Sequence, residues 1–140
     1  MLADKIELEV VTPERLVLSE TVTWVEMPGK DGYLGVLPGA APLLTELGVG
    51  LLTYRKGDVS KILTVIDGYA EVLPDRVVVL AELSEKAEEI DVARAQSAAT
   101  KAQEQLAKAA GKDVEWQNAS FALERALVRL QAAGKGPAHA

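Results

Sequence analysis

Apolar and polar residues alternate along the first 84 residues in short runs, with the period of two that is typical of a half-buried β-strand. The clearest run places Ile6, Leu8 and Val10 around two glutamates. Similar runs, rich in β-branched, leucine and aromatic residues, lie at 16–18, 22–27, 51–54, 62–66, 69–73 and 77–80. Turn-forming Pro, Gly and Asp residues separate them at 12–14, 28–32, 56–58, 67–68 and 74–75. The pattern predicts a β-sandwich of about ten short strands.

From residue 85 the apolar spacing changes to alternating steps of three and four residues, which marks one face of an α-helix. The first such seam consists of Val92, Ala95, Ala99, Ala102 and Leu106. The second consists of Trp116, Ala119, Leu123, Ala126 and Leu130. Between them, Gly111 offers a left-handed helix cap and Asp113 an N-cap. Because this connection is short, we predict an antiparallel hairpin of two helices, each of about 20 residues.

The predicted fold is therefore α+β, with a β-sandwich domain at 1–84 and a helical hairpin at 85–140 whose tail frays from residue 134. Alanine in both seams lets the helix axes approach closely. It buries little area per residue, however, at about 25 cal/mol per Å². We expect a hairpin that is only marginally stable alone and able to dock, open or refold against a partner.

Composition and charge divide the chain at the same point. Residues 1–84 hold five of the six prolines and eight of the eleven glycines, whereas residues 85–140 hold sixteen alanines. The whole net charge of -6 belongs to the first part, and this acidity argues against a nucleic-acid partner. Cysteine is absent and His139 is the single histidine, which argues against thiol chemistry, histidine triads and multi-histidine metal sites. We expect a cytosol-facing chain, since no apolar stretch approaches a membrane span.

Several short motifs follow one another in a distinctive order. They are Pro28-Gly29 with Gly32, then GVLPGAAPLLT at 35–45, DGYAEV at 67–72, IDVARA at 90–95 and LERALVRL at 123–130. In this order, and over nearly its whole length, the chain resembles the ε subunit of F-type ATP synthase in its bacterial form. The succession of motifs carries the resemblance, rather than any one of them.

The resemblance implies a non-catalytic rotor subunit of a proton-translocating rotary ATP synthase. Its sandwich would bind the γ subunit and rest on the c-ring. Its hairpin would fold onto the sandwich, or extend along γ toward the α and β subunits and inhibit ATP hydrolysis. The subunit would be monomeric when isolated, require no cofactor, respond to a regulatory ATP, and lie peripherally at the cytoplasmic face of the bacterial inner membrane.

Two loops would face the rotor ring in this family. Their residues here are Pro28, Gly29, Asp31, Gly32, Tyr33, Pro38, Gly39, Ala40 and Pro42. The chain departs from the family pattern at two of these positions. Ala40 stands where histidine is common, and Tyr33 stands where glutamate is frequent.

The start of the first helix has two interpretations. The resemblance implies a nucleotide site formed by Glu85, Ile90, Asp91, Arg94, Ala95, Arg125 and Arg129. The simpler interpretation is that Asp91 caps the helix and the arginines form a solvated face. Capping is the favoured interpretation, and the nucleotide site stays open.

A second hypothesis is a small-molecule-binding or scaffold module that dimerises through its helical hairpin. Catalysis has no support in either case. The carboxylates of the chain have no paired histidine, no oxyanion loop and no metal-ligand spacing around them.

Overall fold

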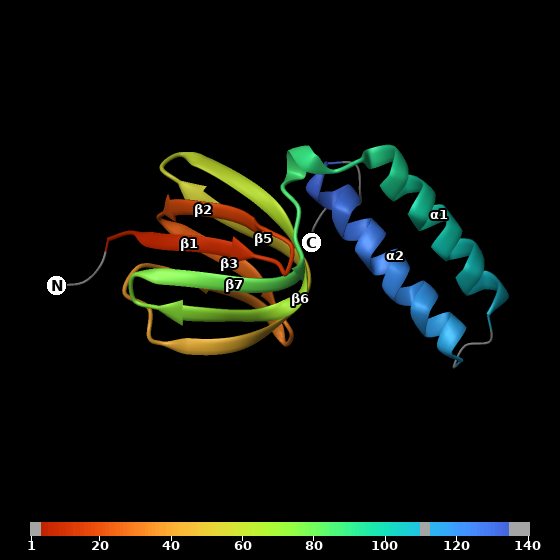
Figure 1. Cartoon of the computed structure of the whole chain (residues 1–140), viewed down its shortest axis with the longest axis horizontal. Coiled ribbons are helices and arrows are strands. Elements are labelled where there is room, and N and C mark those ends of the chain that lie inside the picture. The colour runs from red at the N-terminus through yellow and green to blue at the C-terminus, as the bar shows by residue number, and fades with distance from the viewer. Residues whose placement is uncertain (1–3, 110–112, 135–140) are drawn as a thin grey trace. The chain divides into compact units, whose positions relative to one another are not determined.

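The structure, a computed structural model, describes residues 4–109 and 113–134 and consists of two compact units that divide between Lys86 and Ala87 (Figure 1). The first unit is built of β-strands and the second of helices. Gly111 and the tail beyond residue 134 lie outside the described residues.

The division falls two residues beyond the predicted boundary because residues 84–86 stay attached to the sheet. The backbone N–H of Thr64 donates to the carbonyl of Glu85 at 2.9 Å. The N–H of Glu85 in turn donates to the hydroxyl of Thr64 at 3.0 Å, and Lys86 forms an isolated bridge with Leu63. Glu85 therefore belongs to the sandwich unit.

Seven strands are present in the described residues. They are β1 (Ile6–Val11), β2 (Leu16–Val22), β3 (Trp24–Gly29), β4 (Gly32–Val36), β5 (Leu43–Lys56), β6 (Val59–Leu73) and β7 (Arg76–Leu83). They form one sheet in the order β2-β1-β7-β6-β5-β3-β4, in which β1 and β7 are parallel and the other pairs antiparallel.

The long hairpin of β5 and β6 belongs to both layers of the sandwich (Figure 1). Residues 66–73 of β6 pair with β7, whereas Leu47 and residues 53–55 of β5 pair with β3. Within the part of β6 that pairs with β7, the hairpin bends at Asp67 and Gly68, whose φ angles are 56° and 129°. The sheet thus folds over on itself, and its inner faces enclose the core.

About ten strands were predicted, and the described residues contain seven. One predicted pair of short strands, 62–66 and 69–73, is a single continuous strand. The predicted turn at Asp67-Gly68 was wrong, since both residues lie inside β6. Gly68 is a glycine for a different reason. A Cβ there would overlap the carbonyl oxygen of Leu80 on β7, so the neighbouring strand approaches too closely for any side chain.

The two layers are joined where the ends of β2 and β5 meet. The Thr23 N–H donates to the carbonyl of Arg55 at 2.8 Å. Lys56 Nζ lies 2.9 Å from Glu20 Oε2, and this hydrogen bond lowers the pKa of the Glu20 carboxyl. The pair is largely exposed, so it contributes little to stability. It lies at the place where the two layers of the sandwich are joined.

The helical unit contains a 3₁₀ turn, Ala87–Glu89, and the helices α1 (Val92–Lys108) and α2 (Val114–Ala132). Both predicted N-caps are confirmed. The Asp91 carboxylate accepts from the Arg94 N–H at 3.1 Å, and that of Asp113 accepts from the Trp116 N–H at 2.8 Å.

Candidate functional site

A row of apolar side chains crosses the outer face of one layer of the sandwich. Tyr69 of β6 lies opposite Leu80 of β7, and Leu80 lies beside Val11 of β1. Val11 in turn lies opposite Leu16 of β2. Tyr69, Leu80 and Leu16 keep 53%, 55% and 56% of their surface exposed. We call these four residues the apolar row.

The pairing register of the strands explains why the apolar row lies on the outer face of the sandwich. One residue along β6, β7 and β1, a matching row of Ala70, Val79 and Val10 is buried in the core. On β2 the buried residue opposite Val10 is Leu18, two residues from Leu16, because the register shifts between Val10 and Val11. Because successive side chains point to opposite faces of a sheet, the register that buries this second row exposes the first. An outer face is normally polar, and a continuous exposed apolar row marks an interaction surface.

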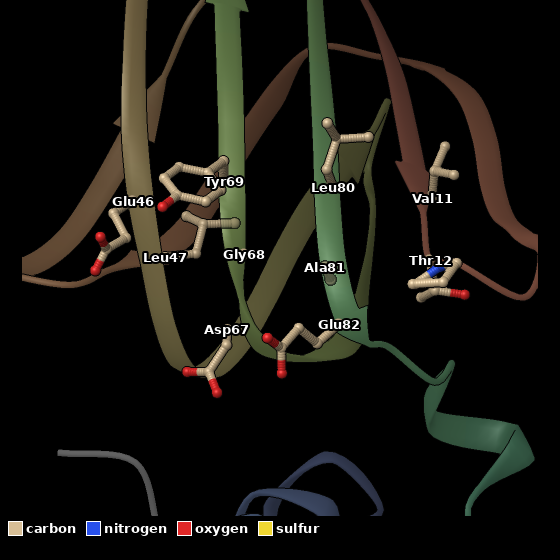
Figure 2. A pocket seen from close by; sticks show the side chains of 11 residues that line it. Val11, Thr12, Glu46, Leu47, Asp67, Gly68, Tyr69, Leu80, Ala81 and Glu82 are labelled. Carbon is tan, nitrogen blue, oxygen red and sulfur yellow. The ribbon is translucent and has the colours of Figure 1, made fainter.

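A hollow of about 630 Å³ lies along one end of the row. Figure 2 shows Tyr69, Leu80 and Val11 beside it, with the carboxylates of Asp67 and Glu82 at its lower edge. Glu46, opposite Tyr69 on β5, adds a third carboxylate, and no Lys or Arg is among the described residues that line the hollow. The surface is therefore complementary to a partner that presents apolar and basic side chains together.

Sequence analysis did not find the apolar row, although the sequence carries one signal of it. Residues 77–80 are four consecutive apolar residues. A strand with one face in water should alternate. The run therefore indicates a strand that is apolar on both faces, but only the pairing with β1 and β6 shows which residues continue it.

The first predicted rotor-facing loop is the two-residue turn between β3 and β4. Gly29 and Gly32 pair at its base, and Lys30 and Asp31 form its tip. The tip is tied to β5 by the Lys30 N–H, which donates to the Glu46 carbonyl at 2.9 Å. Lys30 Nζ also lies 2.7 Å from Glu46 Oε2, and this bond raises the pKa of the Lys30 ammonium. Asp31 is exposed at the tip.

The second predicted loop, residues 37–42, joins β4 to β5 and is anchored elsewhere. The Gly39 N–H donates to the carbonyl of Pro74 in the β6–β7 turn at 2.7 Å, and Gly39 has a φ of 85°. Ala40 packs against the core, whereas Pro42 is exposed and Pro38 is half-buried. Tyr33 and Pro28 lie on the first hairpin, where Pro28 is buried and faces Tyr33 across the strand pair.

The residues of the predicted nucleotide site fall in both units. Glu85 lies on the sandwich, and Ile90, Asp91 and Arg94 lie at the start of α1. Ala95 is buried in the core between the helices rather than presented to solvent. Half-buried Arg125 and Arg129 lie on the part of α2 that packs against the first half of α1. The capping role of Asp91 is the one that the structure shows.

The hairpin seam is packed most closely near the start of α1. Its core there is formed by Ala95, Ala99, Ala126 and Leu130, with Val92, Leu123 and Leu127 against it. Ala102 and Ala119 are also buried, Leu106 is half-buried, and Trp116 keeps 37% of its surface exposed. A hollow of about 560 Å³ separates the end of α1 from the start of α2. The two helices are therefore held together mainly at one end.

Known families match both units of the chain. Residues 5–87 match the β-sandwich domain of the ATP synthase delta/epsilon chain, and residues 88–134 match its long α-helix domain. The chain belongs to the ATP synthase delta/epsilon chain family. As a member, it is a subunit of ATP synthase other than the catalytic one, and the predicted resemblance and fold class are confirmed.

Individual relatives agree with this assignment. The ATP synthase epsilon chain of Syntrophobacter fumaroxidans is 48% identical over 134 residues, which cover 96% of this chain and 99% of the relative. That of Koribacter versatilis is 50% identical over 105 residues, covering 75% of this chain and 74% of the relative. The family therefore favours the rotor-subunit hypothesis over a module that dimerises through its hairpin.

Solved structures share the fold of this ATP synthase subunit. A chain from the Euglena gracilis mitochondrial ATP synthase, in an OSCP/F1/c-ring assembly, has a TM-score of 0.80 at 22% identity and covers 95% of this chain and 83% of its own length. One from a Tetrahymena thermophila central stalk/c-ring assembly has a TM-score of 0.59 at 15% identity, covering 92% and 96%.

Over residues 4–109 and 113–134, neither helix of the subunit has the length and apolar character needed to span a membrane. In the same residues, His, Asp and Glu side chains form no group of three that would hold a metal ion.

Proposed function

We propose that this chain works in the central stalk of ATP synthase, where its sandwich binds the γ subunit through the apolar row. The row carries the proposal because Leu80, Tyr69 and Leu16 are large and more than half exposed. Tyr69 neighbours Leu80, and Val11 connects Leu80 to Leu16. Such a surface gains stability when a partner covers it. Family membership supplies the partner, since chains of this fold occur in F1/c-ring and central-stalk assemblies.

In this arrangement the β3–β4 turn and the 37–42 loop face the c-ring. The turn is suited to contact because its tip is tied to β5 at Glu46, so little conformational freedom is lost on binding. The subunit then lies at the periphery of the membrane, on the cytoplasmic side in a bacterium, and reaches the membrane only through the rotor.

The test of this function uses an ATP synthase complex from which this subunit has been removed and γ retained. Adding the purified chain is expected to give stoichiometric binding to γ and to restore the coupling of ATP hydrolysis to proton pumping in membrane vesicles. A chain that neither binds γ nor changes coupling would contradict the proposal. A chain that forms a concentration-dependent dimer and does not bind γ would favour the alternative hypothesis of a module that dimerises through its hairpin.

The hairpin is proposed to regulate ATP hydrolysis by changing between a docked and an extended state. Its seam supports this role, because five of its buried positions in the described residues are alanines that bury little area each. A small change in packing therefore shifts the balance between states.

Replacing Ala99 with leucine is expected to wedge the helices apart and to destabilise the hairpin by about 1–3 kcal/mol. Ala99 is buried in the seam, so the larger side chain has no space. In the reconstituted complex, the variant should inhibit ATP hydrolysis more strongly than the unmodified chain. Ala98→Leu is the matched control, since Ala98 is its exposed neighbour in α1. Equal hydrolysis for both variants and unchanged helix proximity would argue against regulation by the hairpin.

Regulatory ATP binding at the start of α1 is proposed from the family resemblance. If it occurs, Arg94→Ala should lower the affinity for ATP about tenfold or more, because it removes a donor for phosphate. Isothermal titration calorimetry of the isolated chain measures this directly. Arg76→Ala, on the sandwich, is the control. If the unmodified chain gave no heat of binding with ATP, the proposal would be contradicted. Asp91 would then only cap α1, and Arg94 would only form part of its solvated face.

A further inference from the structure

Strands β3 and β5 pair normally at one end and again at Gly29, but their register shifts between Glu26 and Gly29. Pro28 lies in this interval and has no N–H to donate. In the facing stretch of β5, the Leu51 N–H donates to the hydroxyl of Tyr33 at 3.1 Å. Tyr33 belongs to β4, so its phenol reaches across β3 to satisfy a backbone donor on β5.

The space for the phenol is provided by Gly50. A Cβ at this residue would lie 2.6 Å from the Tyr33 hydroxyl and 2.7 Å from Cβ of Pro28. Real side chains do not tolerate such distances, so Gly50, Pro28 and Tyr33 fit together only while residue 50 has no side chain. Gly50 and Pro28 are both buried, and Tyr33 covers them from the outside with 43% of its own surface exposed.

We infer that Tyr33 is a positioning residue that fixes the orientation of the β3–β4 hairpin for its partner. Besides the strand pairing of β3 with β5, two contacts hold the hairpin on β5, one at the tip through Lys30 and Glu46 and one on the flank through Tyr33 and Leu51. The Lys30–Glu46 ion pair at the tip is exposed and weak, so the tip contact depends mainly on the Lys30 N–H. The Tyr33 hydroxyl satisfies a backbone donor next to buried Gly50. In the sequence, Tyr33 departs from the family pattern, because it stands where glutamate is frequent in a loop expected to contact the c-ring. In the structure its polar atom is used by the chain itself.

This inference rests on the proposed function only where it assigns the hairpin to the rotor ring. The positioning itself is tested on the isolated full chain by amide hydrogen exchange. Tyr33→Phe keeps the ring and removes the acceptor, so the Leu51 amide should exchange about tenfold faster, or more. Tyr69→Phe, which removes a phenolic hydroxyl from the outer face, is the matched control and should leave Leu51 unchanged.

Gly50→Ala is the second variant, because its new methyl group displaces the phenol while Tyr33 is retained. It should speed exchange at Leu51 as Tyr33→Phe does. Unchanged exchange at Leu51 in Tyr33→Phe would overturn the inference.

A second experiment tests the functional role of Tyr33. It measures binding of the chain, in complex with γ, to detergent-solubilised c-ring. Tyr33→Phe should weaken this binding by about threefold to tenfold while the affinity for γ stays unchanged. Faster exchange at Leu51 with unaltered c-ring binding would overturn the assignment of a positioning role. An unmodified chain that does not bind the c-ring would instead overturn the proposed function, and the exchange result would still decide whether Tyr33 holds the hairpin.

Discussion

Replacing Gly68 with alanine is expected to destabilise the sandwich by about 4 kcal/mol. Its φ of 129° is a conformation that non-glycine residues rarely adopt, at a cost of about 1–3 kcal/mol. The added methyl group would also collide with the backbone of β7 at Leu80 and Ala81, which adds about 1–3 kcal/mol of overpacking. A loss of this size is a large fraction of the stability of a domain, about 5–15 kcal/mol, so the variant should unfold at a clearly lower urea concentration.

Gly57→Ala is the matched control for this prediction. Gly57 also has a positive φ, of 63°, but a Cβ there meets nothing within 4 Å. Its replacement should cost only about 1–2 kcal/mol, from the backbone alone. Urea unfolding followed by Trp24 fluorescence, in a Trp116→Phe background, reports on the sandwich. Equal losses for the two variants would show that the close approach of β7 does not set the requirement for Gly68.

Replacing Leu80 with glutamate is expected to weaken binding to γ by about 100-fold or more. Leu80 lies in the middle of the apolar row, between Tyr69 and Val11. A carboxylate buried there under a partner would lose its hydration without gaining a counter-charge, a cost of about 3 kcal/mol.

The control is Val59→Glu, because Val59 is an equally exposed apolar residue at the start of β6, away from the row. Affinity for the γ-containing complex is measured by titration with each fluorescently labelled variant, after circular dichroism has confirmed folding. Neither residue is buried, so both variants should unfold within about 1 kcal/mol of the unmodified chain. If Leu80→Glu bound γ as tightly as Val59→Glu, the apolar row would not be the docking surface.

Sequence patterns predicted the helical hairpin almost completely, because its determinants are local. The three-four spacing that begins at Val92 defines one face of a helix. Asp91 and Asp113 can satisfy the first N–H groups of a helix wherever it packs. The α2 residue Trp116 is the exception, since it remains 37% exposed near the end of the hairpin where the helices are less closely packed.

The candidate sites were predicted less well, because they depend on which strands become neighbours. The turn between β3 and β4 was located by its Pro28-Gly29 and Gly32, yet the sequence offered no reason for Tyr33. Its reason is a register shift between β3 and β5, which places Leu51 within reach of its hydroxyl. The apolar row combines residues of four strands that are up to 69 positions apart, and no local pattern records such an arrangement.

The amino-acid sequence by itself therefore determined the division into an acidic sandwich and an alanine-rich hairpin, the helix caps and the family resemblance. These follow from periodicity, composition and the order of motifs along the chain. Only the tertiary structure decided that Asp67-Gly68 is a bend within β6, that Gly50 makes room for a phenol, and that Leu80 lies in an exposed row. Each of these depends on the distance between strands, which is fixed by register and packing across the whole sheet.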